Sequence, residues 1–353
     1  MVNRIGHIDV AKGISITLVV LLHSRLSHHF EEALMPMSLF RMPLFFFLSG
    51  VFFSYSQPAT SFVLKKGEAL LKPYFLVLLT AWLVSSWFNQ DLLLWQLKGI
   101  FYANGHTIEW TPLWFLPHLF AVHCFVYFLF RFGKFGVLPH FLQWLCVGGM
   151  FVVGLFILQL FWQIEFVTFE RAFYLQGLPY SLDLLLVTSA FFIAGYQLKT
   201  VVCAFKPSLP LAIACVLVFS FVIYFTDAHI DFNYRKFVAP SAALLAATAG
   251  IYLVLAFSWW IVHFKLGVGV LRTLGSASLY ILLFHYWIDH ALYDLGKGRF
   301  YNNLLVLSCI TFMASLALPL VIKWGAERNN LLALYFLPFK TNPCLEWLRQ
   351  GKK

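Results

Sequence analysis

Ten apolar segments, separated by short polar or charged stretches, run along almost the whole chain. Each is close to the ~20 residues that an α-helix needs to cross a bilayer. The pattern therefore predicts an all-α integral membrane protein, a bundle of about ten transmembrane helices. We expect one membrane domain over residues 1–323 and a short cytoplasmic tail over 324–353. The segments cover residues 9–29, 40–57, 73–90, 112–132, 141–162, 179–198, 209–226, 239–263, 276–293 and 303–323.

Composition supports the membrane assignment. Of the 353 residues, 61% are hydrophobic and 11% charged, and the mean hydropathy is +0.80. Soluble globular domains contain about 25% charged residues, so this balance excludes an ordinary soluble fold. Six cysteines are present, and none has the close spacing of a metal site, so no metal is expected.

The basic residues predict the orientation of the chain. With a cytoplasmic N-terminus, 17 of the 25 Lys and Arg residues fall on the cytoplasmic side, and both termini are then cytoplasmic. The net charge of +10 is explained by this bias, so we expect a lipid bilayer and no nucleic acid as partner. The eight basic residues on the other side are Arg25, Arg41, Lys98, Arg171, Arg235, Lys236, Lys297 and Arg299.

Ionisable side chains within the first apolar segment are candidates for function, because charges at membrane depth cost several kcal/mol unless paired or hydrated. This segment contains Asp9, Lys12 and His23. Lys12 and His23 are eleven residues apart, so they project from nearly one helix face at positions about 16 Å apart. One interpretation is that both side chains line one polar passage. The other is that Lys12 extends to the cytoplasmic lipid headgroups while His23 forms a hydrogen bond to a neighbouring helix.

Further polar groups are predicted at a depth similar to that of His23. His285 and Asp289 are four residues apart on one helix face, so the carboxylate is placed to orient or charge the imidazole. His118 lies near the outer end of the fourth segment. Several helices thus bring polar groups to one level, which exceeds what packing alone requires.

The segment around the second span has two notable features. Pro43 suits the first turn of a helix, while Ser49 and Gly50 allow close helix contact. The loop that we expect over residues 57–72 carries Lys65, Lys66 and Lys72. These cations are suited to bind either the phosphates of a nucleotide-like donor or anionic lipid.

Several motifs together resemble acyltransferase family 3 membrane proteins. Asp9-Val10-Ala11-Lys12, with ten residues between Lys12 and His23, resembles the family's opening basic-x10-His signature, although many relatives have Arg at the basic position. Residues 41–50, RMPLFFFLSG, resemble its second span. Matches continue in order with LWFL at 113–116, FFIAGY at 191–196 and SLYILLFH at 278–285. The lysine at the basic position, Lys12, and the Lys65-Lys66 pair indicate a resemblance to the fucose-4-O-acetylase-like branch of the family.

The resemblance implies a membrane O-acyltransferase that moves acetyl from cytoplasmic acetyl-CoA to a hydroxyl of a cell-surface or exported carbohydrate or glycolipid. The site would then lie in the cell's cytoplasmic membrane, and no permanently bound cofactor is expected. Lys12, Lys65, Lys66 and Lys72 would hold the donor.

In that reaction His23 would act as general base, or would itself carry the acyl group, because an imidazole can exchange a proton near neutral pH. Arg41 or His118 would stabilise the oxyanion, with Asp9, His285 and Asp289 in the polar cluster. The alternative is a carbohydrate exporter or flippase that uses the same groups as a proton relay. Inverted repeats would favour that alternative, and the sequence shows none clearly.

Overall fold

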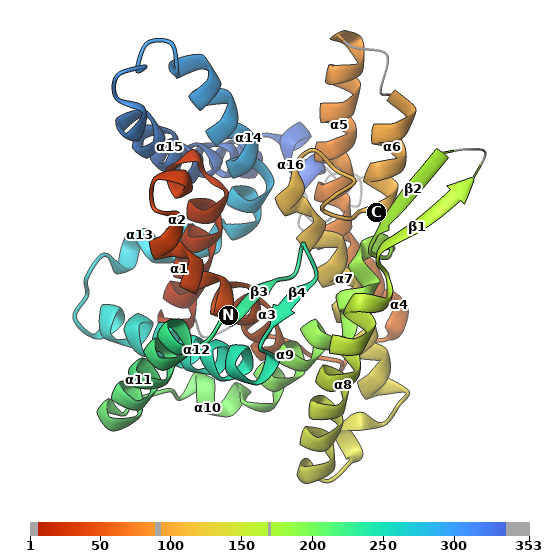
Figure 1. The fold of residues 1–353 in the computed structure, drawn as a ribbon, viewed down its shortest axis with the longest axis vertical. Coiled ribbons are helices and arrows are strands. Elements are labelled where there is room, and N and C mark those ends of the chain that lie inside the picture. The colour runs from red at the N-terminus through yellow and green to blue at the C-terminus, as the bar shows by residue number, and fades with distance from the viewer. Residues whose placement is uncertain (1–5, 89–92, 169–170, 337–353) are drawn as a thin grey trace, which may run out of the picture. The chain divides into compact units, whose positions relative to one another are not determined.

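The computed structural model describes residues 6–88, 93–168 and 171–336, and the statements below concern these residues (Figure 1). They are mainly helical, as predicted. The chain divides into two compact units. The first comprises Met1–Phe53 and Phe191–Leu320, and the second comprises Ser54–Ala190 and Val321–Lys353. Each unit is described by itself.

Eight helical runs of the described chain are long and apolar enough to cross a membrane. A ninth candidate is the pair Val268–Ser276 and Ser278–Gly296, which is bent by 85°, and the apolar helix Leu209–Phe225 is shorter. Every predicted segment therefore coincides with a helical run, and the polytopic all-α prediction is confirmed. The cytoplasmic placement of both termini stays a prediction, since residues 1–5 and 337–353 lie outside the described residues. The eight runs are Gly6–His23, Glu31–Val51, Ala59–Trp87, Thr111–Arg131, His140–Leu160, Pro179–Gln197, Pro240–His263 and Leu304–Arg328.

The first unit is organised around helix α1 (Gly6–His23), which packs against four other helices. Its core includes Ile8, Leu44, Val51 and Leu255, all nearly inaccessible to solvent. A short antiparallel hairpin, which the sequence did not predict, pairs β3 with β4. The elements are α1, η1 (Arg25–His29), α2 (Glu31–Leu34), η2 (Met35–Met37), α3 (Ser38–Val51), the end of α9 (Leu185–Gln197), α10 (Lys199–Cys203), α11 (Leu209–Phe225), β3 (His229–Asp231), β4 (Lys236–Val238), α12 (Pro240–His263), α13 (Val268–Ser276), α14 (Ser278–Gly296) and most of α15 (Leu304–Arg328).

Two glycines bring α1 and α13 into backbone contact. A Cβ atom added at Gly13 would collide with the carbonyl of Leu271, and one added at Gly275 would collide with the carbonyl of Asp9. Small residues at helix interfaces are typical of membrane proteins, because lipid offers no hydrophobic drive for helix association and close packing must supply it. The position of α1 is therefore fixed by contacts that tolerate no side chain.

A second glycine pair joins α3 to α9. A Cβ atom at Gly50 would collide with the carbonyl of Phe192, and one at Gly195 would collide with the carbonyl of Phe47. The expectation that Gly50 allows close helix contact is thus confirmed. The expectation for Pro43 is wrong: α3 begins at Ser38, so Pro43 lies inside the helix rather than in its first turn. Arg41 lies within α3, as the predicted segment 40–57 implied.

The second unit contains the long helical run Ala59–Trp87, which replaces the loop expected over residues 57–72. A π-helical turn, η3, connects α4 to α5 without breaking the run. A hairpin of β1 and β2 was also not predicted. The elements are α4 (Ala59–Lys66), η3 (Gly67–Leu71), α5 (Lys72–Phe88), α6 (Leu93–Tyr102), η4 (Thr111–Trp114), α7 (Phe115–Arg131), η5 (Phe135–Val137), α8 (His140–Leu160), β1 (Trp162–Thr168), β2 (Arg171–Gln176), η6 (Pro179–Leu184), the start of α9, the end of α15 and α16 (Asn330–Phe336).

Candidate active site

Helix α1 carries three of the predicted site residues on one unbroken run of 18 residues. Lys12 lies near its N-terminal end, where the ammonium group is 3.8 Å from the centroid of the Phe52 ring. Asp9 is the acidic neighbour of Lys12. His23 is the last residue of the helix. The eleven-residue spacing therefore holds Lys12 and His23 near one face, about three turns apart.

The ring of His23 lies against helix α14. Its centroid is 5.9 Å from that of His285 and 6.5 Å from that of Tyr286. Arg41, from α3, and His290, from α14, are close enough to act on His23 electrostatically. Two helices, α3 and α14, thus place basic groups around the imidazole carried by α1, and all three helices contribute these residues from the first unit.

His285 presents an unused acceptor at this site. Its Nδ1 bonds the carbonyl oxygens of Ile281 at 2.8 Å and Leu282 at 3.1 Å in its own helix. A carbonyl can only accept, so Nδ1 carries the proton, and Nε2 of the neutral ring has a free lone pair. Nε2 is buried and has no hydrogen-bond partner among the described residues. This ring is 1% exposed, so its lone pair faces the interior of the unit.

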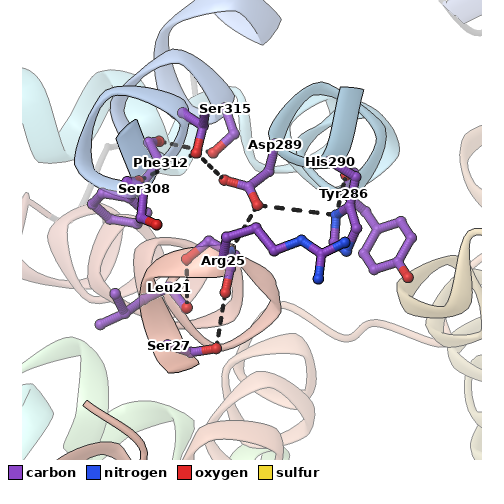
Figure 2. Close-up of polar contacts among 11 residues, drawn as sticks. Leu21, Arg25, Ser27, Tyr286, Asp289, His290, Ser308, Phe312 and Ser315 are labelled. Carbon is purple, nitrogen blue, oxygen red and sulfur yellow. Dashed lines mark hydrogen bonds and ion pairs between the residues drawn. The ribbon is translucent and has the colours of Figure 1, made fainter. Parts of the chain in front are cut away.

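Asp289 does not pair with His285, contrary to the sequence-based expectation. Its Oδ2 accepts the backbone N–H of Arg25 at 2.7 Å, and its Oδ1 accepts the hydroxyl of Thr311 at 2.8 Å. Figure 2 shows the carboxylate between α14, α15 and the turn that follows α1. The nearest imidazole is His290, whose Nδ1 lies 3.9 Å from Oδ2. Asp289 therefore joins three elements next to His23 and is a positioning residue.

Two arginines of the first unit have buried nitrogens without hydrogen-bond partners among the described residues, and one of them, Arg41, acts on His23. Within the described chain, Nε and Nη1 of Arg41 and Nε of Arg25 are buried and have no hydrogen-bond partner. Arg41 has Asp231 as its acidic neighbour. Arg25 was not among the predicted site residues and was counted only among the basic residues of the non-cytoplasmic side. Its position two residues after His23 was the signal that could have selected it.

His118 has a different environment, in the second unit. Its Nδ1 donates to the carbonyl of Tyr180 at 3.0 Å, and its Nε2 lies 2.9 Å from the hydroxyl of Thr188. The ring is fully buried. Both nitrogens are thus engaged in joining α7 to η6 and α9, which is the environment of a structural histidine. The oxyanion role considered for His118 is better suited to Arg41, with its unpartnered N–H groups.

The three basic residues expected in a loop lie on the helical run of the second unit. Lys65 donates to the side chain of Gln57 at 2.8 Å and is exposed. Lys66 is half-buried, with its ammonium group 5.8 Å from the Phe62 ring centroid. Glu68 is the acidic neighbour of Lys72. Among residues 6–88, 93–168 and 171–336, no group of three His, Cys, Asp or Glu side chains is placed to hold a metal ion.

Comparison with protein families identifies the chain. A family model described as an acyltransferase domain, that of acyltransferase family 3, matches residues 5–324. The chain belongs to acyltransferase family 3. This match extends over both units and includes every predicted site residue. Comparisons with curated proteins and with solved structures found no match. Membership in the family and the apolar helical runs together make this chain a multi-pass membrane acyltransferase.

Proposed function

We propose that this acyltransferase transfers an acetyl group from cytoplasmic acetyl-CoA to a hydroxyl group of a cell-surface or exported carbohydrate. The observation that carries the proposal is the His23 ring beside the free Nε2 of His285, in a chain that belongs to an acyltransferase family. We assign the protein to the cell's cytoplasmic membrane, with the donor reaching it from inside and the acceptor from outside.

His23 is the general base in this proposal. As the acceptor oxygen attacks the thioester carbonyl, His23 takes the hydroxyl proton. The carbon–oxygen bond forms, the carbon–sulfur bond breaks, and the proton passes to the departing thiolate, giving an acetyl ester and free CoA. Attack by His23 itself on the thioester would instead release CoA and give an acetyl-imidazole. The acceptor hydroxyl would then attack the acetyl carbonyl and release the His23 imidazole. Trapping labelled acetyl on the protein in the absence of acceptor distinguishes the two routes.

Arg41 and His285 support His23 in different ways. The partial negative charge that develops on the carbonyl oxygen needs preorganised donors, and one good donor contributes about 3–4 kcal/mol. Arg41 offers two buried, unpartnered nitrogens beside His23. We assign His285 a positioning role that acts through His23: in the reacting state its free Nε2 would accept the N–H of the His23 ring, which leaves the other His23 nitrogen as the base.

The donor end of the reaction is assigned to basic residues away from His23. Lys12 lies about 16 Å along α1 from His23. In acetyl-CoA the long pantetheine arm separates the thioester from the phosphates, so a thioester at His23 leaves the phosphates at a distance from it. We assign the binding of phosphates to basic residues of each unit taken by itself, to Lys12 in the first and to Lys65, Lys66 and Lys72 in the second. The basic character of these four side chains is what supports the assignment.

Substitution of His23 tests the proposal. Membranes that contain His23→Ala should transfer no labelled acetyl from acetyl-CoA to endogenous glycan, whereas His28→Ala should transfer it normally. His28 is a suitable control because it is exposed and lies five residues further along, in η1. Mass spectrometry of the surface glycan should show one acetyl group less in the first variant. Full acetylation by a normally inserted His23→Ala protein would overturn the catalytic assignment.

A further inference from the structure

The side chain of Arg25 lies near an aromatic ring and forms no hydrogen bond within the described chain. Its backbone N–H is bound by Asp289 at 2.7 Å, and its guanidinium carbon lies 5.5 Å from the centroid of the Tyr293 ring. In Figure 2 the guanidinium group extends from the turn after α1 toward His290. Within the described chain it makes no hydrogen bond and no ion pair, and its Nε is buried. The group is therefore oriented by the fold without its donors being used.

Carboxylates near Arg25 are already engaged elsewhere. Asp289 accepts from a backbone N–H and from Thr311. Asp294 is bonded to Lys297 at 2.8 Å. A buried donor without an acceptor costs about 1–3 kcal/mol, and more when it is charged. Asp294 is close enough to Arg25 to act on it electrostatically, but neither acid bonds the buried Nε, so a ligand is the natural source of that acceptor.

We propose that Arg25 binds an anionic group of the carbohydrate acceptor, a carboxylate or a phosphate, next to the hydroxyl that His23 deprotonates. This inference rests on the proposed function and narrows its acceptor to acidic carbohydrates. A guanidinium group has five N–H donors in a planar fork, which matches the oxygens of a carboxylate or phosphate. His23 ends α1 and Arg25 begins the turn that follows it, so an acidic sugar bound by Arg25 lies at the end of the helix that carries the base.

The location favours the acceptor over the donor as the source of this anion. Arg25 lies just beyond the His23 end of α1, while Lys12 lies near the opposite end. When the thioester of acetyl-CoA is at His23, the pantetheine arm carries its phosphates away from that position. The anion at Arg25 is therefore part of the molecule that receives the acetyl group.

Binding to the purified full-length protein in detergent tests this inference without any acetyl transfer. The probes are glucuronic acid and glucose, which differ only by the carboxylate, with glucose 1-phosphate, inorganic phosphate and CoA as further arms. We expect glucuronic acid or glucose 1-phosphate to bind at least tenfold more tightly than glucose. Arg25→Gln should abolish that preference and Arg25→Lys should reduce it. Arg299→Gln, which removes an exposed arginine of the same unit, should leave it unchanged.

Any of the following results would overturn the inference: equal affinity for the acidic and neutral sugars, an unaltered preference in Arg25→Gln, or dependence on Arg25 for CoA and inorganic phosphate alone. Absence of binding by every acidic sugar up to its solubility limit would also overturn it. His23→Ala separates this inference from the proposed function, since it should keep the preference while losing transfer. Acidic-sugar binding through Arg25 without acetyl transfer by the wild-type protein would refute the function and leave the anion subsite standing.

Discussion

Removal of the Asp289 carboxylate should loosen the junction that holds His23. The carboxylate accepts two hydrogen bonds, from the backbone N–H of Arg25 at 2.7 Å and from Thr311 at 2.8 Å. Asp289→Ala leaves the Arg25 N–H without an acceptor. Thr311 loses less, because its hydroxyl also lies 3.2 Å from the carbonyl of Ser308. The damage should therefore be concentrated at Arg25, next to the end of α1.

The expected magnitude follows from these two bonds. Hydrogen bonds to charged groups contribute about 1.5–3 kcal/mol in soluble proteins, whereas side-chain bonds within a membrane average about 0.6 and reach about 1.7 kcal/mol. We expect Asp289→Ala to lower the free energy of unfolding by about 3 kcal/mol, toward the upper end of two membrane bonds. Asp289→Asn should cost about 1 kcal/mol, since its amide can accept from Arg25 and donate to Thr311.

Unfolding of the purified variants, followed by tryptophan fluorescence, measures these differences, and a cycle with Thr311→Val isolates the bond between Asp289 and Thr311. Acetyl transfer per folded molecule should fall further in Asp289→Ala than in Thr311→Val, because only the former releases Arg25. If Asp289→Ala unfolded at the same free energy as the wild type, the carboxylate would not be holding α14, α15 and α1 together.

Three further predictions concern other parts of the chain. Gly50→Val and Gly195→Val should each prevent accumulation of folded protein in membranes, because a side chain at either position meets backbone atoms. The control variant Gly149→Ala should accumulate normally, since its added Cβ meets nothing within 4 Å. Equal levels of all three variants would refute the interpretation of the interface between α3 and α9. His118→Phe should lower the melting temperature by removing two contacts while leaving acetyl transfer per folded molecule unchanged, and a selective loss of transfer would restore a catalytic role. Lys72→Gln should raise the KM for acetyl-CoA with little change in kcat, and an unchanged KM would remove Lys72 from the donor site.

Most of the fold could be predicted from the sequence because hydrophobic length alone decides which segments can cross a bilayer. All ten predicted segments coincide with helical runs. The boundaries were less accurate where helices continue past the apolar core. Residues 59–72 are polar enough to resemble a loop, yet a π-helical turn carries the helix through them. The bend of 85° between α13 and α14 likewise leaves no mark on hydropathy.

The sequence predicted which apolar segments carry the candidate site residues but not which groups their side chains contact, and the catalytic roles stay predictions. The eleven-residue spacing correctly placed Lys12 and His23 on one continuous helix. The spacing of His285 and Asp289 suggested a pair, but it gives no information on the competing donors that α1 and α15 bring to the carboxylate. Similarly, Arg25 follows His23 by two residues, and only tertiary structure shows that its backbone is bound while its side chain is not.

Gly13 lies near the middle of α1, and its close contact with Leu271 is a point about which the helix can tilt. Ten residues separate Gly13 from His23, which corresponds to about 15 Å of helix. A tilt of α1 by about 5° about the contact at Gly13 would move the His23 imidazole by about 1 Å. A misplacement of that size can lower the rate of the catalysed reaction about a hundredfold. Substitutions far from the chemistry, on the face of α13 that meets α1, can therefore tune or silence catalysis without altering any residue around the imidazole.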